Sequence, residues 1–307
     1  MILLASPGQG AQTPGFLQPW LEVPGVADRL AWWSAVTGLD LVRYGTTADA
    51  EEIRDTAVAQ PLLVAAALAA YEALYPGGSR PDAVAGHSVG ELAAAVIAGV
   101  LSPEAALVLV RERGRAMAEA AAVTETGMTA VLGGDPDEVL ASIDKHGLTP
   151  ANVNGAGQIV AAGTIARLEE FASEPPPRAR LRSLSVAGAF HTEHMAPAVD
   201  TLRRLAPGAP VADPAITLLS NRDGAAVGTG REYVGRIVEQ VSAPVRWDAC
   251  MTTMRELGVT AIIELPPAGT LVGLAKRELK DAGVATLALK TPEDLDKAHE
   301  LIEAHTS

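Results

Sequence analysis

Apolar runs of four to seven residues recur in both halves of the chain. Each run is followed by a segment in which apolar residues recur with helical periodicity. Runs of this kind, with few polar positions between the apolar ones, are typical of parallel strands that are buried on both faces. We predict such strands at residues 2–5, in the short run that ends at residue 86, and at residues 215–219, 259–265 and 284–289. We expect helices at residues 60–75, from the end of the 86–90 turn to about 98, and at 103–122, 192–205, 231–241, 244–257, 269–281 and 292–304, with short helices between 14 and 56. The pattern predicts an α/β fold with a parallel sheet covered by helices.

Residues 127–186 show a different order of predicted strands and helices. Predicted strands at 128–132, 149–153, 158–162 and 180–186 alternate with predicted helices at 135–146 and 165–172. The order βαββαβ is the ferredoxin-like pattern. We therefore predict a large α/β-hydrolase-like domain made of residues 1–126 and 188–307, with a small ferredoxin-like domain inserted at 127–187.

Composition narrows the functional classes. The net charge of −13 argues against nonspecific binding of nucleic acid, because a phosphate backbone attracts a basic surface. The single cysteine, Cys250, excludes an intramolecular disulfide and a cysteine-rich metal site, and it fits a reducing compartment. The apolar run at 62–70 is too short to span a bilayer, and the amino-terminal run lacks a basic flank, so we expect a cytoplasmic protein without a membrane segment or a bound metal.

The most informative stretch for chemistry is the Gly-x-Ser-x-Gly turn at residues 86–90, which joins a predicted strand to a predicted helix. Glycines on both sides allow a tight, strained corner that exposes the serine, and the helix start behind it favours negative charge. Ser88 is thus a candidate nucleophile for attack on a carbonyl. The glycine loop at residues 7–12, which leaves the first strand, could bring its backbone and the Gln9 amide close to a ligand, although a plain turn fits it equally well.

A serine nucleophile requires a base within hydrogen-bonding distance. His191 stands where the chain returns from the predicted small domain, and we favour it over His194, which lies one turn further on. His87 is next to the serine and is better read as a packing or orienting residue. Arg113 lies on the helix after the serine helix and could direct its guanidinium toward Ser88, where it would recognise a carboxylate.

Several motifs in one order resemble a known family, the stand-alone malonyl-CoA:acyl carrier protein transacylases of bacterial fatty-acid and polyketide synthesis. They are PGQGAQ at 7–12, GHSVGE at 86–91, the pair Arg113-Gly114, NVNGAGQIVAAG at 152–163, GAFHTEHM at 188–195 and QVSAPVRW at 240–247. The resemblance covers essentially the whole chain. It implies an enzyme with no bound cofactor, whose substrate is malonyl-CoA and whose acceptor is the phosphopantetheine of an acyl carrier protein.

The resemblance also implies roles for individual residues. Ser88 would carry the acyl group, His191 would act as general base and acid, and Arg113 would bind the malonyl carboxylate. The oxyanion would be held by the backbone N–H groups of Val89 and Gln9, and a backbone carbonyl near Gln240 would orient the histidine. Residues of the small domain that match a polar cleft segment, and could equally cap a turn, are Asn152, Asn154 and Gln158.

Phe190 resembles the malonyl-selective form of the family, since a bulky ring leaves little room for an α-methyl branch. Two other readings stay open, an acyl-thioester hydrolase and a transferase for another extender unit such as methylmalonyl. The carrier protein would be a transient partner of a monomer, docking on Arg178, Arg180 and Arg182 or on Lys276, Arg277 and Lys280, although solvated surface charge is the default reading of both groups.

Overall fold

The computed structural model describes residues 1–305, in which the strands form two five-stranded sheets. The first sheet has the order β10-β9-β1-β2-β7, and its neighbouring strands are parallel. Its strands are β1 (Ile2–Ser6), β2 (Ala83–Gly86), β7 (Thr217–Leu218), β9 (Ala261–Glu264) and β10 (Ala285–Ala288). They coincide with the predicted apolar runs, so the parallel α/β fold is confirmed.

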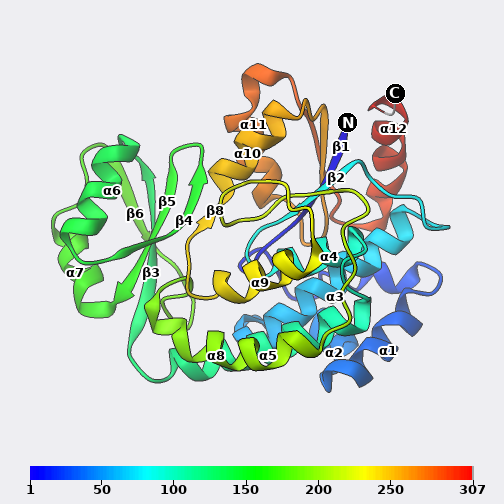
Figure 1. Ribbon diagram of the computed structural model, residues 1–307, viewed down its shortest axis with the longest axis horizontal. Helices are drawn as coiled ribbons and strands as arrows, with labels where there is room; N and C mark the ends of the chain where they lie inside the picture. The colour runs from blue at the N-terminus through cyan, green and yellow to red at the C-terminus, as the bar shows by residue number, and fades with distance from the viewer. Residues whose placement is uncertain (306–307) are drawn as a thin grey trace.

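Both faces of this sheet are buried, as unbroken apolar strands require. In β1, Ile2 and Leu4 belong to one core and Leu3 and Ala5 to a second core on the opposite face. Helices therefore cover the sheet on both sides (Figure 1). The helices outside the insert are α1 (Val26–Thr37), α2 (Leu41–Thr46), α3 (Thr56–Leu74), α4 (Gly90–Ile97), α5 (Pro103–Ala121), α8 (Ala196–Leu205), α9 (Gly230–Gln240), α10 (Trp247–Glu256), α11 (Thr270–Glu278) and α12 (Leu295–His305).

Helix α3 is longer than predicted. It begins at Thr56, where the Asp55 side chain accepts a hydrogen bond from the Ala57 N–H, and Pro61 therefore lies inside the helix and not in its first turn. Among the described residues it is the one helix long and apolar enough to cross a membrane by length and composition. However, 78% of its most apolar 18-residue window is buried inside the protein, so α3 is a core helix of the fold.

The segment with the different order of elements forms the second sheet, shown in green in Figure 1. Its elements are β3 (Thr126–Gly133), α6 (Pro136–Lys145), β4 (Thr149–Gly155), β5 (Gln158–Thr164), α7 (Ile165–Ser173) and β6 (Ala179–Ser183). The order β6-β3-β5-β4, with antiparallel neighbours, places the first strand between the third and the fourth, and confirms the ferredoxin-like element pattern. The sheet packs α6 and α7 over a core of its own that includes Val131, Ile143 and Phe171.

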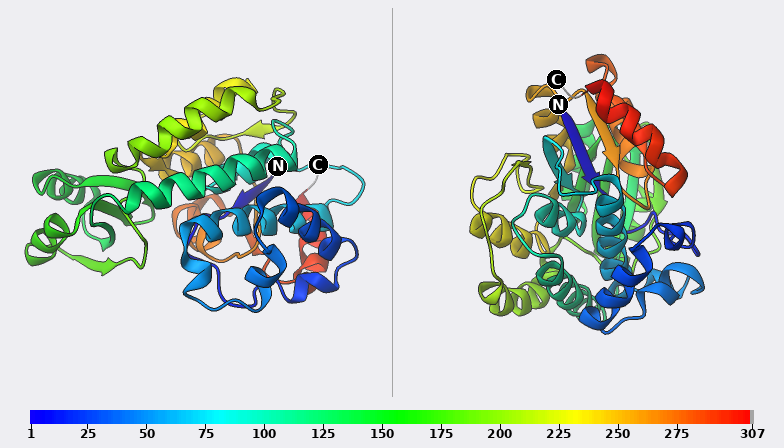
Figure 2. Two further views of the ribbon diagram at one scale, coloured as in Figure 1. Left: turned by 90° about the horizontal axis from the view of Figure 1, so that it is seen from below. Right: turned by 90° about the vertical axis from the view of Figure 1, so that its right-hand side faces the viewer.

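One strand of the second sheet was missed. Residues 244–257 were predicted to be helical, but β8 (Val245–Arg246) precedes α10 and pairs in parallel with β4, Asn152 opposite Val245. The mixed second sheet thus includes a strand from outside 127–187, and the predicted domain boundaries stay a prediction. The helices α5 and α8 run side by side at the chain's entry to and exit from the insert (Figures 1 and 2). Together with β8 they connect the small sheet to the rest of the fold.

Candidate active site

Ser88 lies at a sharp corner between β2 and α4. Its φ angle is 54°, in the left-handed region that non-glycine residues rarely adopt. The flanking glycines are required by space, because a Cβ on Gly86 would lie 2.1 Å from the Gly90 carbonyl carbon, and one on Gly90 would lie 2.2 Å from the Ser6 carbonyl oxygen. The sequence therefore enforces a corner that holds the serine hydroxyl out into a cavity.

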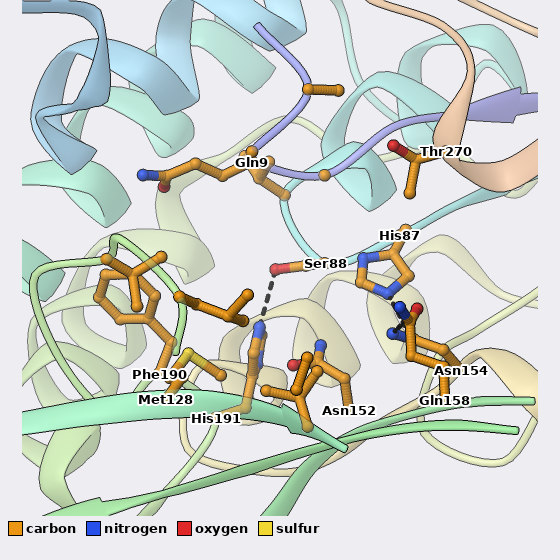
Figure 3. Close-up of a pocket in the computed structure, with 18 of the residues that line it drawn as sticks. Gln9, His87, Ser88, Met128, Asn152, Asn154, Gln158, Phe190, His191 and Thr270 are labelled. Carbon is orange, nitrogen blue, oxygen red and sulfur yellow. Dashed lines mark hydrogen bonds between the residues drawn. The ribbon is translucent and has the colours of Figure 1, made fainter. Parts of the chain in front are cut away.

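His191 meets the serine across this cavity (Figure 3). Its Nε2 lies 2.8 Å from the Ser88 Oγ, and its Nδ1 lies 2.7 Å from the Gln240 carbonyl oxygen. Burial, and next the positive charge of Arg113, lower the pKa of His191 to about 3. The imidazole is therefore neutral at pH 7. Its Nδ1–H donates to the carbonyl, which leaves the Nε2 lone pair facing the serine hydroxyl.

Arg113 is almost completely buried, at 1% exposure, and its guanidinium points at the serine. Its Nη2 lies 3.4 Å from the Ser88 Oγ and donates to the Gln240 side-chain oxygen at 3.0 Å, while Nη1 donates to the side-chain oxygen of Gln60. Burial lowers the pKa of Arg113 to about 10, so the side chain remains a cation at neutral pH. The site thus holds a desolvated positive charge next to the nucleophile.

Two backbone N–H groups near the serine are available for an oxyanion. Within the described chain, neither the Val89 N–H nor the Gln9 N–H donates to another protein group. The Gln9 side chain is held by hydrogen bonds to its neighbours. Its amide nitrogen donates to the Arg54 carbonyl and its oxygen accepts from Thr56, although Gln9 also lines the cavity. Figure 3 shows the side chain leading away from Ser88.

The three polar residues of the insert lie at the cavity but differ in their contacts. The Asn154 oxygen is hydrogen-bonded to the His87 Nε2 at 2.9 Å, and its nitrogen donates to the Gln158 oxygen at 3.0 Å. Asn152 lines the same cavity and points toward His191 (Figure 3). The cavity, of about 390 Å³, lies between the insert and the parallel sheet, and Phe190 and Met128 form part of its apolar wall.

Three residues of the site were not singled out from the sequence. Gln60, on α3, accepts from Arg113 and lines the cavity. Asn221 accepts from the Ser88 N–H at 2.8 Å, and Glu91 is a buried acid at the start of α4. Gln60 and Glu91 are isolated polar residues among the apolar residues of predicted helices, and Asn221 follows the carboxyl end of a predicted strand. Either pattern is a signal that could have found them.

No group of three or more His, Cys, Asp or Glu side chains within residues 1–305 is arranged to hold a metal ion.

A serine on a strand–turn–helix corner, in contact with a neutral histidine, defines an enzyme of acyl transfer through a covalent acyl-serine. The sequence matches the family described as acyl transferase domain over residues 7–305, and the chain belongs to this family. It is therefore an acyltransferase, and the predicted family is confirmed.

Relatives and solved structures cover nearly the same length. The chain is 55% identical over 300 residues to the malonyl CoA-acyl carrier protein transacylase of Mycobacterium tuberculosis, covering 97% of this chain and 99% of that protein. It is 32% identical over 303 residues to the protein of that name from Escherichia coli K12, covering 96% and 97%. The crystal structure of MCAT from Mycobacterium tuberculosis superposes with a TM-score of 0.93, 55% identity and coverage of 97% and 99%. A type II PKS acyl-carrier protein complex with its malonyl-transacylase gives a TM-score of 0.89, 30% identity and coverage of 98% and 99%.

Proposed function

We propose that this acyltransferase moves a malonyl group from coenzyme A to the phosphopantetheine thiol of an acyl carrier protein. The observation that carries the proposal is Arg113, whose guanidinium lies 3.4 Å from the Ser88 Oγ inside a buried pocket. A fixed cation in an acyl pocket is costly to keep without a partner, and the free carboxylate of a malonyl thioester provides one. The similarity to malonyl CoA-acyl carrier protein transacylases supports the same substrate and acceptor.

The reaction would proceed in two matched halves. His191 Nε2 takes the Ser88 proton as Oγ attacks the thioester carbonyl, and the oxyanion forms opposite the Val89 and Gln9 N–H groups. Collapse of the tetrahedral intermediate breaks the C–S bond, and the imidazolium returns its proton to the leaving thiolate of coenzyme A. In the second half the phosphopantetheine thiol gives its proton to His191 and attacks the malonyl-serine ester. The C–O bond to Ser88 Oγ then breaks, and the imidazolium returns the proton to Oγ, which restores the Ser88 hydroxyl. The Gln240 carbonyl holds the ring in place throughout.

We propose that the polar residues of the insert contact the pantetheine arm. Asn152, Asn154 and Gln158 line the cavity, so a thioester entering between the two sheets would pass them. Their amides offer both donors and acceptors, which suits the two amide groups of that arm. No separate cofactor takes part in this scheme.

Phe190 would set the preference for malonyl. Its ring lies in the cavity wall beside His191 and is 7% exposed. An α-methyl branch on the acyl group would meet this wall, and steric exclusion of one methyl group contributes about 1–3 kcal/mol. The preference over methylmalonyl is therefore expected to be incomplete. Hydrolysis is the alternative outcome for an acyl-serine, and the rates of water and thiol attack distinguish the two.

The acyl carrier protein is the proposed partner, and the two basic groups named above remain its candidate docking surfaces. Arg180 and Arg182 are exposed on the edge strand β6, and Arg182 also lines the cavity. Lys276, Arg277 and Lys280 are exposed on and after α11, whose first turns also line the cavity. An acidic carrier would be attracted to either group. We further propose that the enzyme acts as a monomer in the cytoplasm, where a free thiol such as Cys250 persists.

The proposed reaction is tested by intact-mass analysis. The protein is offered malonyl-, methylmalonyl- and acetyl-coenzyme A together and then a carrier protein with its phosphopantetheine arm. We expect a malonyl adduct that Ser88→Ala lacks and that the carrier removes faster than water does. A stable malonyl adduct on the Ser88→Ala protein would overturn the assignment of the nucleophile, and turnover by water at the rate of thiol transfer would favour the hydrolase.

Docking is tested separately by reversing charge. Arg180→Glu should raise the KM for the carrier and leave malonyl loading from coenzyme A unchanged, and Lys280→Glu tests the other group in the same way. A cluster whose reversal leaves the KM for the carrier unchanged is not the docking surface.

A further inference from the structure

Glu91 is a buried carboxyl group to which the reaction scheme gives no task. It occupies the first turn of α4, directly behind the serine corner, and is 1% exposed. Its Oε1 accepts the Asn221 N–H at 2.6 Å, and its Oε2 accepts from the side-chain nitrogen of Gln240 at 2.5 Å. Both oxygens thus face donors, which an ionised carboxylate satisfies and a protonated one cannot satisfy in full.

The Glu91 carboxylate fixes the orientation of the Gln240 side chain. The Gln240 nitrogen also faces the Asn221 side-chain oxygen at 3.1 Å and the Ser88 carbonyl oxygen at 3.3 Å. With the nitrogen held among three acceptors, the Gln240 oxygen is turned toward Arg113 and accepts from its Nη2 at 3.0 Å. A reversed amide would place a donor against the guanidinium and an oxygen against a carboxylate.

Arg113 gains its electrostatic balance through the same chain. Its hydrogen-bond partners in the described chain are uncharged oxygens of Gln60, Ser88 and Gln240. The attraction between Glu91 and Arg113 raises the pKa of the arginine against the effect of burial. When it is ionised, Glu91 therefore supplies a negative charge near the guanidinium without occupying the position next to Ser88 that a substrate carboxylate would take.

A second branch of the network leads to the serine backbone. Asn221, held by Glu91, accepts the Ser88 N–H at 2.8 Å and donates to the Gly86 carbonyl at 2.7 Å, so it binds the corner at two points on the amino-terminal side of the serine. Gln240 in turn offers its backbone carbonyl to His191. One carboxylate is thus connected through Asn221 to the nucleophile, and through Gln240 to the base and the guanidinium.

We propose that ionised Glu91 is a positioning residue for malonyl loading, holding the Gln240 amide so that Arg113 faces Ser88 with its fork oriented for a carboxylate. This inference rests on the proposed function and deepens it. It predicts that damage to Glu91 affects acyl groups that carry a carboxylate more than those that do not.

The ionisation of Glu91 gives the site a pH dependence. Burial raises the pKa of Glu91 to about 8, opposed by the Asn221 N–H and by the charges of Arg113 and Arg236, and assisted by Asp223. The other titratable groups that face Glu91 are Tyr233 and Cys250. Their pKa values lie above the ordinary ones, because of burial first and the Glu91 charge next. The network is complete above about pH 8 and loses the Gln240 contact as the carboxyl group takes up a proton. The folded state holds this proton more tightly than the unfolded chain does. Protonation of Glu91 therefore stabilises the fold at low pH, and this stabilisation is lost as pH rises from about 4.5 to 8.

The experiment is single-turnover loading of the full-length enzyme from malonyl- and acetyl-coenzyme A between pH 6 and 9. In Glu91→Gln the new amide nitrogen faces the Gln240 nitrogen, so Gln240 turns and Arg113 loses an acceptor. At pH 8.5 we expect kcat/KM for malonyl to fall about 10- to 100-fold, mainly through KM, the range expected for one hydrogen bond to a charged group. Acetyl has no carboxylate to meet Arg113 and so does not use this hydrogen bond, and its loading should change less than about 3-fold.

The pH profile separates positioning from support of the fold. Wild-type malonyl loading should rise through about pH 8, since that is where the raised pKa of Glu91 lies. Glu91→Gln should be flat over this range, whereas Glu91→Asp, which keeps the carboxylate, should retain the rise. Glu119→Gln removes the same charge from the exposed face of α5 and should behave as wild type. If Glu91→Gln does not fold, Glu91→Asp and the wild-type profile still decide the question.

Equal losses of malonyl and acetyl loading, or a wild-type profile identical to that of Glu91→Gln, would overturn the inference. Failure of the proposed function looks different, because the wild-type protein would then take no malonyl from coenzyme A at any pH.

Discussion

Replacing Arg113 by alanine should separate malonyl loading from acetyl loading. A malonyl group on Ser88 carries its free carboxylate into the pocket where the guanidinium lies 3.4 Å from the serine oxygen. In Arg113→Ala the carboxylate enters a buried site without this partner. Acetyl has no such group, so it loses only the weak contact between the guanidinium and the nucleophile.

The magnitude follows from the burial of the pair. Removing one partner of a buried, hydrogen-bonded ion pair costs about 3–5 kcal/mol. Because each 1.36 kcal/mol corresponds to a factor of ten, kcat/KM for malonyl loading should fall by roughly 10² to 10⁴. We expect acetyl loading to change less than about 10-fold, by the same conversion. Arg113→Lys should fall between wild type and alanine, since an ammonium keeps the charge but not the two parallel donors.

The assay is single-turnover acylation followed by intact mass, with malonyl- and acetyl-coenzyme A offered separately at several concentrations. Arg115→Ala is the matched control, because this arginine lies two residues further along the same helix with its side chain 52% exposed. It should load both acyl groups as wild type does. If Arg113→Ala loses malonyl and acetyl by the same factor, the guanidinium supports the site as a whole and the reasoning about a carboxylate partner is wrong.

Three further predictions concern the base, the acyl pocket and the corner. The pKa of His191 is about 3 in the folded state and about 6.5 in the unfolded chain. The unfolded chain therefore takes up a proton first, and the free energy of unfolding decreases as the pH is lowered below about 6.5. Relative to His191→Ala, the wild-type free energy of unfolding should thus fall by about 2 kcal/mol from pH 7 to pH 5 in denaturant titrations; a constant difference would contradict the low pKa. Phe190→Ala should raise the methylmalonyl-to-malonyl ratio about 10-fold or more in competition assays, and an unchanged ratio would remove the ring from the selectivity argument. Gly90→Ala should abolish loading, because the added methyl group would clash with the Ser6 carbonyl. Gly235→Ala is the control: Gly235 lies on α9 with open space at its Cβ position, so this variant should load normally and gain about 0.5–1 kcal/mol in stability.

Much of the fold was predictable because its signals are local. The serine corner is encoded by two glycines whose added Cβ atoms would clash, and the start of α5 by Ser102, whose side chain accepts from the Ala105 N–H, with Pro103 in the first turn. The ferredoxin-like pattern of the second sheet could be recognised from element order alone. By contrast, β8 has two residues and exists through its pairing with β4, about ninety positions earlier in the chain. No local pattern encodes such a pairing, and local spacing favoured a helix there.

The site divides in the same way between local and distant signals. The glycine turn and the family motifs pointed to Ser88, His191 and Arg113, which the structure brings together. The partners that hold them come from α3, α4 and the ends of β7 and α9, and sequence distance conceals their contacts. The Gln9 side chain could not be placed from its loop alone, and its hydrogen bonds to the Arg54 carbonyl and the Thr56 hydroxyl join residues more than forty positions apart.

Both members of the Ser88–His191 pair have left-handed backbones, with φ angles of 54° and 61°. Such conformations cost about 1–3 kcal/mol each and persist only where the surroundings determine them. At Ser88 the corner is held by Asn221, and at His191 the N–H donates to the Val241 carbonyl while Nδ1 donates to the Gln240 carbonyl. The end of α9 therefore fixes both the backbone and the ring of the histidine. The fold itself places the two residues 2.8 Å apart, so the cost of aligning them is met during folding, and binding energy from the thioester can go to orienting its carboxylate on Arg113.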